Sequence, residues 1–300
     1  MATKKQKDGM RCFKEQFGAR IEAALRDTPF NLDFMTAIAV QETFEIWGQI
    51  YRKLPVDQVL ALCVGDSIGG PARKAFPTSK ADLLKWPGGA AMFDIARASL
   101  AAVGQYVRSY KTAWQQGKFC HGYGIFQYDL QSFKTDPDYF LEKQWADFDK
   151  CLATALGELQ AARKRAKLGA KDALTDMELA FVAIAYNAGS VNPAKGLKQG
   201  YYNKSDKTYY GEDFWDYFLA AKAIPDHAEP APLIEAAPSQ QPSRPPNQPP
   251  SQPPSQPTTG SGPPRRRIPR QPVDQSMAAE APPRERTTGP GGPRSRQIEG

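Results

Sequence analysis

Aromatic residues are absent from the C-terminal part of the chain, where no Phe, Trp or Tyr occurs between Pro238 and Gly300. The same stretch holds 17 of the 27 prolines. A segment of this composition buries too little apolar surface to offset the entropy lost on ordering. We therefore expect a disordered Pro/Arg-rich tail or linker at residues 226–300 and one well-packed domain at residues 10–225.

Cysteine and histidine are scarce, with four and two residues respectively, and no pair of cysteines has the Cys-x-x-Cys spacing. This pattern predicts no metal site, and nothing in the sequence implies an organic cofactor. The four cysteines allow three disulfide pairings, and buried free thiols are the alternative. The sequence leaves this choice open for Cys12, Cys63, Cys120 and Cys151.

Long apolar runs are also missing, so we expect no membrane span. The charged start, from Met1 to Asp8, is not followed by the apolar segment of a signal peptide. The net charge of +7 lies mostly between residues 238 and 300, where nine Arg face four acidic residues. The rest of the chain carries 30 basic and 28 acidic residues, a balance that does not indicate a nucleic-acid partner.

The tail has two features that suggest partners. Its Pro-rich repeats around residues 250–257 favour an extended polyproline conformation, which SH3-like grooves bind. The Arg265–Arg267 run is suited to anionic polymers such as wall phosphates or lipid headgroups. The alternative is a spacer that its charge keeps in solution.

Apolar residues recur with helical spacing through most of residues 10–225, and alternating β patterns are few, which predicts a mainly α domain. The capping-box spacing of Thr175 and Glu178 marks one helix start, and Gly189 is placed to end that helix. The predicted helices cover 11–26, a segment capped by Asn31, 56–64, a segment from 78–82 to 87–89, 90–114, 138–168, 179–186 and 214–221.

One acidic residue stands out among these helices. Glu42 follows Ile38, Ala39 and Val40 and precedes Phe44 on the helix that Asn31 caps. Apolar surroundings hold the proton of a carboxyl group more tightly, which suits a general acid near neutral pH. Taken alone, Glu42 is more simply interpreted as an exposed or salt-bridged helical Glu.

Two further stretches offer groups that bind sugars. Gly122–Gln127 is a Gly-rich stretch that we interpret as a turn, and its Gln127 carries both a donor and an acceptor for a hydroxyl or acetamido group. Tyr186 and Asn187 close an apolar helix just before Gly189. The phenol is suited to orienting the acid and the amide to binding an acetamido group; a core aromatic and a helix-terminal Asn are the alternatives.

Together, these stretches resemble the lysozyme-like superfamily, specifically its soluble lytic transglycosylase and goose-type lysozyme group. Ala185–Gly189 matches the family's Ala-Tyr-Asn-Ala-Gly segment without change, and Gly124–Gln127 is similar to its Gly-Leu-Met-Gln turn. Gln41–Thr43 resembles its Gln-Glu-Ser, and the order along the chain agrees. The separation of Glu42 from Gly124 is larger than in compact members, so we interpret residues 50–118 as a large helical insertion against or over the cleft.

The resemblance implies a peptidoglycan-cleaving enzyme with a lysozyme-like helical fold. Glu42 would be the single general acid and base at the β-1,4 bond between N-acetylmuramic acid and N-acetylglucosamine, leaving 1,6-anhydro ends. Glu45 and Asp66 are the nearest alternative acids, and Asp66 is the candidate second carboxylate that a hydrolase would need. The implied substrate-binding residues are Gly124, Ile125, Phe126, Gln127, Tyr186 and Asn187.

Several alternatives remain open from the sequence. A muramidase or a chitinase-type hydrolase would use the same site, and a non-catalytic glycan-binding module would hold strands without cutting them. An interaction protein that acts through its tail is a third class. The expected partner is the peptidoglycan glycan strand, and the expected place of action is the cell wall or periplasm. Since no signal peptide is visible, the protein would be delivered by a non-classical route or by a phage, or the sequence would have a truncated start. A cytoplasmic location is the alternative.

Overall fold

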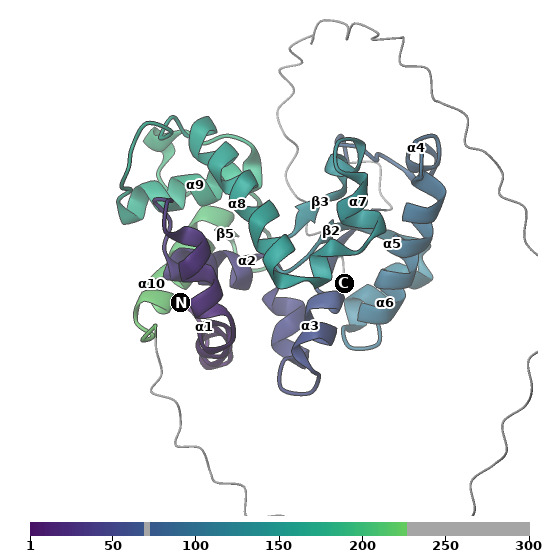
Figure 1. Cartoon of the computed structure of the whole chain (residues 1–300), viewed down its shortest axis with the longest axis horizontal. Coiled ribbons are helices and arrows are strands. Elements are labelled where there is room, and N and C mark those ends of the chain that lie inside the picture. Colours follow the sequence, from purple (N-terminus) through teal and green to yellow (C-terminus); the bar gives the residue numbers. More distant parts are fainter. Residues whose placement is uncertain (69–72, 227–300) are drawn as a thin grey trace, which may run out of the picture. The chain divides into compact units, whose positions relative to one another are not determined.

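The structure is a computed structural model that describes residues 1–68 and 73–226. The predicted disordered tail therefore lies, apart from Asp226, outside the described residues. The described residues form ten α-helices, three short 3-10 helices and five strands (Figure 1). In chain order these are α1 (Lys4–Leu25), α2 (Leu32–Ile50), α3 (Val56–Leu62), β1 (Val64–Ile68), α4 (Lys80–Leu84), α5 (Gly89–Val103), α6 (Arg108–Gln115), β2 (Phe119–Tyr123), β3 (Tyr128–Asp129), η1 (Leu130–Lys134), α7 (Pro137–Leu141), η2 (Gln144–Ala146), α8 (Phe148–Arg165), α9 (Asp176–Ala188), η3 (Pro193–Lys195), β4 (Tyr202–Asn203), β5 (Thr208–Tyr209) and α10 (Tyr210–Lys222).

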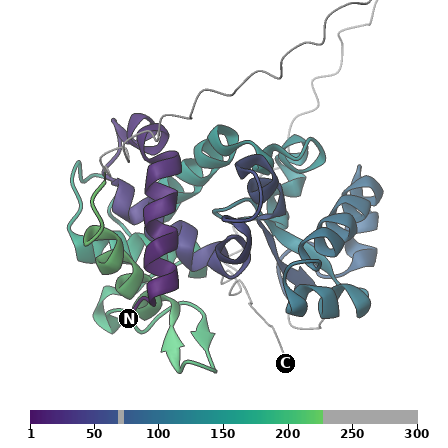
Figure 2. The ribbon, with the colours of Figure 1, turned by 90° about the horizontal axis from the view of Figure 1, so that it is seen from below.

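Helix α2 is the centre of the packing. Asn31 caps it, as predicted, by accepting a hydrogen bond from the backbone N–H of Phe34, and nearly all of its residues are buried. It packs against α1 on one side and against α10 on another (Figure 2). Because the helix is surrounded in this way, a polar side chain on it must find a partner or face an opening.

The buried ammonium of Lys14 fastens the end of the described chain to α1 and α2. Its Nζ contacts Asp33 and Asp226, each at 2.6 Å, and donates to the carbonyl groups of Ala221 and Ile224. A charge this deep is tolerated because every donor has an oxygen partner. Lys14 thereby holds the C-terminal end of α10 against the helix that carries Glu42.

A three-stranded antiparallel sheet, in the order β1–β2–β3, interrupts the helical pattern. Gly65 pairs with Gly122, and Tyr123 pairs with Tyr128. Two predictions need correction here. Val64 begins a strand instead of ending a helix, and Gly122 and Tyr123 belong to β2, so the turn is confined to Gly124–Gln127. Short strands of this kind were missed because two- to five-residue segments show little alternation.

Two predicted long helices are each divided. The segment 90–114 breaks between α5 and α6 at Gly104, where a Cβ would come within 3.0 Å of the backbone of Lys111 as α6 folds back. The segment 138–168 breaks before α8, because the Asp147 side chain accepts from the backbone N–H groups of Asp149 and Lys150 and starts a new helix. The predicted capping box of Thr175 and Glu178 on α9 is confirmed.

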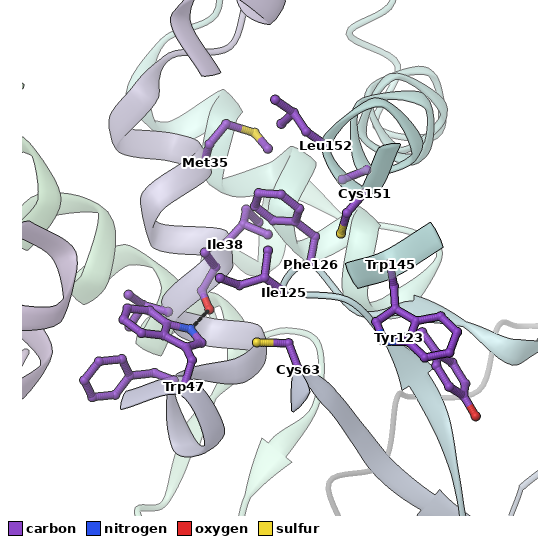
Figure 3. Packing of buried hydrophobic residues seen from close by; sticks show 14 of the residues in the cluster. Met35, Ile38, Trp47, Cys63, Tyr123, Ile125, Phe126, Trp145, Cys151 and Leu152 are labelled. Carbon is purple, nitrogen blue, oxygen red and sulfur yellow. Dashed lines mark hydrogen bonds between the residues drawn. The ribbon is translucent and has the colours of Figure 1, made fainter. Parts of the chain in front are cut away.

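The core joins the β2–β3 turn to the helices around it. Ile125 and Phe126 of the turn lie among Met35 and Ile38 of α2 and Leu152 of α8 (Figure 3). Both turn residues are almost fully buried. This packing fixes the turn against α2 and thereby sets the distance between the two motifs that the sequence analysis singled out.

The described residues bear out the coarse prediction of a mainly α domain. The described part of residues 50–118, interpreted as an insertion, contains the helices α3 to α6 but also β1, which pairs with β2 in the three-stranded sheet. All four cysteines have free thiols, and three of them are buried. Among the described helices, none is long and apolar enough to cross a bilayer.

Candidate functional site

A pocket beside α2 collects residues from the three motifs. Glu42 and Gln41 come from α2, Gln127 from the turn, and Asn187 from the end of α9. The remaining lining residues come from β1 and from the segment that follows α9. The full lining is Gln41, Glu42, Asp66, Gln127, Asn187, Tyr201, Asn203, Tyr210 and Asp213. Side chains separated by well over a hundred residues therefore share one opening.

The β2–β3 turn joins the three motifs through its backbone carbonyl groups. Thr43, next to Glu42, donates its hydroxyl to the carbonyl oxygen of Ile125 at 2.7 Å. Tyr186 donates its hydroxyl to the carbonyl oxygen of Phe126 at 2.6 Å. Both bonds are buried, where an unpaired carbonyl would be unfavourable. The turn is thus bonded to α2 on one side and to α9 on the other.

Glu42 is partly exposed at the pocket although its helix neighbours Ile38, Ala39 and Phe44 are buried. Its Oε1 accepts a 2.8 Å hydrogen bond from the hydroxyl of Tyr210, at the start of α10. The neighbours of Glu42 on α2 are buried and apolar, but the Glu42 side chain itself lines the opening and is only partly buried. This arrangement gives the carboxyl a fixed orientation together with access for a ligand.

The phenol expected to orient the acid was Tyr186, and its hydroxyl donates to the carbonyl oxygen of Phe126. Tyr210, which the sequence analysis did not select, donates to Glu42. In the sequence, the indication for Tyr210 was the aromatic-rich start of α10, but such a pattern normally predicts core packing. The role of Tyr210 as a donor to Glu42 becomes visible only when α10 packs against α2.

The Gln127 side chain lines the pocket but is held firmly by the protein. Its Nε2 donates to the carbonyl oxygen of Gly124 at 2.8 Å and lies 3.5 Å from that of Cys63. The backbone of Gln127 is in the left-handed region, with φ of 58°, which is uncommon for a residue other than glycine. The amide expected to bind a sugar therefore also fixes the turn.

Gly124, Ile125 and Phe126 were expected to contact substrate. The side chains of Ile125 and Phe126 are in the core and are not part of the pocket lining, which corrects that expectation for them. Gly124 has a φ of 84° and stands close to Cys151, where a side chain would collide. These three residues shape the turn, and the functional groups they supply are backbone carbonyls.

Asn187 reaches the pocket from the last turn of α9. Its Oδ1 accepts the backbone N–H of Tyr201 at 3.0 Å, which ties the end of α9 to the chain leading into the β4–β5 hairpin. Tyr201 and Asn203, which line the pocket from this segment, were not foreseen. The hairpin is visible beside the start of α10 in Figure 2, and its two strands are only two residues long.

Two more carboxylates line the pocket. Asp66, the candidate second carboxylate, lies on β1 with a φ of 44°. Strained backbone at Asp66 and at Gln127 on the same pocket is typical of sites where geometry serves function. Glu45, the other alternative acid, is outside the lining and contacts Ser109 at 3.5 Å.

Asp213, one turn after Tyr210 on α10, was missed by the sequence analysis. Burial raises the pKa of its carboxyl, and the neighbouring negative charges of Asp206, Asp216 and Glu212 act in the same direction. A 3.0 Å hydrogen bond from Thr208 opposes this increase. Asp213 therefore keeps its proton to a higher pH than an ordinary aspartate.

Within residues 1–68 and 73–226, no group of three or more His, Cys, Asp or Glu side chains is arranged to hold a metal ion. The pocket is lined by residues with carboxyl, amide and phenol groups. No protein-family model, curated protein or solved structure matched this chain.

Proposed function

We propose that this protein is a peptidoglycan-cleaving glycosidase of lysozyme-like fold that acts as a lytic transglycosylase. One observation carries the proposal: Glu42, Gln127 and Asn187, taken from three motifs that resemble this group, line one pocket. The hydrogen bonds from Thr43 and Tyr186 to the turn support it, because they join the same motifs through their backbone and side chains.

In the proposed reaction, Glu42 protonates the glycosidic oxygen between N-acetylmuramic acid and N-acetylglucosamine, and the bond from that oxygen to the muramic C1 breaks. The Glu42 carboxylate then accepts the proton of the C6 hydroxyl, whose oxygen bonds to C1 and closes a 1,6-anhydro ring. Throughout this step, the hydroxyl of Tyr210 donates to Oε1 of Glu42 and helps to orient the carboxyl. The acid is regenerated without water.

Amide groups at the pocket are suited to the acetamido substituents of such a glycan. Gln41, Gln127, Asn187 and Asn203 line the pocket, and a carboxamide has both donor and acceptor atoms. Some of these atoms already bond to the protein, such as Nε2 of Gln127 and Oδ1 of Asn187, so a glycan would meet the remaining ones. In the proposal, the sugar rings lie along this lining with the scissile oxygen at Glu42. The glycan strand is the substrate, and the Pro/Arg-rich tail is proposed to bind an SH3-like or anionic partner.

Hydrolysis is the second candidate function, and the position of Asp66 in the pocket supports it. Asp66 shares the pocket with Glu42, so it is available as the base that directs a water to the opposite face of the sugar. A muramidase or a chitinase-type enzyme would then leave hydrated reducing ends. A glycan-binding module without cleavage would use the same amides and would not need the carboxyl proton.

Product analysis tests these proposals directly. Purified sacculi and chitin oligomers would each be incubated with the protein, and the released fragments would be analysed by mass spectrometry. We expect muropeptides with 1,6-anhydro ends, which are lighter by one water than hydrolysis products. Hydrated ends would replace the transglycosylase proposal with the hydrolase, and binding without any new chain end would leave the non-catalytic module.

A further inference from the structure

The pocket that contains Glu42 is lined by ionisable side chains of one sign. Among the described residues that line it, three are acidic, namely Glu42, Asp66 and Asp213, and none is Lys, Arg or His. The three acids come from α2, β1 and α10, so the charge is not confined to one wall of the pocket. Protein walls around a cleft screen charges less than bulk water does, which concentrates their field on a bound ligand.

The two aspartates of this pocket differ from the other buried aspartate described above. The Asp129 carboxylate pairs with the guanidinium of Arg73. In the part of the chain that the structure describes, neither Asp66 nor Asp213 forms an ion pair with a basic side chain. Asp213 accepts a 3.0 Å hydrogen bond from Thr208, but a hydroxyl group does not balance a charge. The cationic group of a ligand would balance it.

The surroundings of Asp213 also favour a positive group over a negative one. Asp206, Asp216 and Glu212 are close enough for their charges to add to the effect of burial on its pKa. A cation bound beside Asp213 would relieve this repulsion, and an anion would increase it. The pocket is therefore poorly suited to the free carboxylates of muramic acid and of peptidoglycan stem peptides.

Asp213 lies near the proposed catalytic acid. It is three residues after Tyr210 on α10, and side chains at this spacing are neighbours on a helix, with Cβ atoms about 5–6 Å apart. Tyr210 in turn donates its hydroxyl to Glu42. A sugar ring bound beside Glu42 would therefore meet Asp213 through its substituents. In an amino sugar, the substituent that changes charge is the nitrogen at C2, which is neutral when acetylated and an ammonium when free.

We propose that this pocket selects partly N-deacetylated glycan strands, in which the free ammonium of a glucosamine ring beside Glu42 pairs with Asp213 and Asp66. The neighbouring rings keep their acetamido groups, which suit the amide-bearing residues of the same lining. Stem peptides carry amines together with carboxylates, so the sugar ammonium is the cation that enters without an anion. This substrate preference rests on the proposed function.

Three preparations of peptide-free glycan strands test the proposal, because they differ only in the nitrogen at C2. One is acetylated, one is partly N-deacetylated, and one is deacetylated and then acetylated again with acetic anhydride. At about pH 6, where a free sugar amine is largely protonated, we expect kcat/KM to be about tenfold higher on the deacetylated strands. Renewed acetylation should abolish this gain, and added salt should reduce it by screening.

Charge-removing variants locate the preference in the protein. Asp213→Asn keeps an acceptor for Thr208 but removes the charge, so the ratio of kcat/KM between deacetylated and acetylated strands should fall to about twofold. Asp216→Asn, on the same helix and outside the pocket lining, is the matched control and should keep the ratio. Asp66→Asn is the second variant if Asp213→Asn folds poorly. A ratio near one in the wild type, or a ratio that both pocket variants leave unchanged, would overturn the proposal.

The outcomes separate this proposal from the proposed function. Cleavage of acetylated strands at least as fast as that of deacetylated strands would overturn the preference and leave the glycosidase. If no strand is cleaved, the glycosidase fails, and calorimetric titration with a glucosamine trimer and with an N-acetylglucosamine trimer decides the preference. Tighter binding of the glucosamine trimer that Asp213→Asn abolishes would support it as a binding specificity. Equal binding of the two trimers, or binding of neither, would overturn it.

Discussion

Tyr210 donates a 2.8 Å hydrogen bond to Oε1 of Glu42, joining the start of α10 to the middle of α2 across 168 positions of sequence. The bond contributes to the orientation of the carboxyl at the opening. Asp213 lies one turn further along α10 and lines the same pocket. Helix α10 therefore acts as a wall of the site as well as part of the core.

The proton of Glu42 is the first feature to test. Glu42→Gln keeps the size and the hydrogen-bonding capacity of the side chain but removes the transferable proton, so we expect a loss of about a hundredfold or more in the rate of wall cleavage. Release of fragments from labelled sacculi measures the rate, and circular dichroism checks the fold. Glu45→Gln, three residues away and outside the pocket, should retain nearly full activity. Near-normal lysis by Glu42→Gln would exclude it as the acid.

The Tyr210 hydroxyl is expected to contribute through orientation. Tyr210→Phe retains the buried ring and removes the donor, and we expect cleavage to slow about tenfold, which corresponds to about 1.4 kcal/mol. Tyr217→Phe removes another hydroxyl of α10, one that accepts from Gln6, and serves as the control. Equal rates for the two variants would argue that the Tyr210 bond has no part in catalysis.

The hydroxyl of Thr43 is expected to stabilise the turn against α2. Thr43→Val leaves the buried carbonyl of Ile125 without this donor, which should lower the free energy of unfolding by about 1–2 kcal/mol. Thr36→Val on the same helix removes a hydroxyl that bonds only to the helix's own Leu32 carbonyl, and its effect should be smaller. Chemical denaturation of both variants measures the difference. A smaller loss for Thr43→Val than for Thr36→Val would contradict the proposal that the Thr43 hydroxyl stabilises the turn.

Acid sensitivity should depend on Asp129, at the end of β3. Burial alone would raise the pKa of its carboxyl, but hydrogen bonds and charge from His121 and Arg73 outweigh burial and hold the pKa well below the usual range. Because the folded-state pKa is depressed, this stabilisation is present above about pH 4, the ordinary Asp value, and is lost as the pH falls below it.

Asp129→Asn should therefore lower the free energy of unfolding at pH 7 by about 3 kcal/mol, since it leaves buried Arg73 without its carboxylate. The difference between variant and wild type should shrink as the pH falls from 4 toward 2. Asp176→Asn breaks an exposed pair with Lys222 and should lose less than about 1 kcal/mol. Urea unfolding at several pH values provides the comparison, and a pH-independent difference would refute the assignment.

The helical part of the fold could be predicted where the signal is local. Asn31 and the pair Thr175 and Glu178 cap helices as their sequence patterns predicted, because capping involves residues three or four positions apart. The strands β1 to β3 were missed because segments of two to five residues show little alternation, and because β1 pairs with a strand that is far away in sequence. The predicted helices at 90–114 and 138–168 were drawn too long because two local stop signals were overlooked: Gly104 lies at a close approach to Lys111, and Asp147 caps α8.

The sequence by itself determined a mainly helical domain and three motifs whose residue types suit glycan chemistry. Tertiary structure decided what those residues contact: Tyr186 bonds to the turn, Tyr210 bonds to Glu42, and Asp213 joins the pocket. The sequence does not show whether the hydroxyl of a tyrosine on an apolar helix donates to a carbonyl or to a carboxylate. Long-range packing alone determines which oxygen lies within hydrogen-bonding distance, because that contact depends on how α2, α9, α10 and the sheet come together.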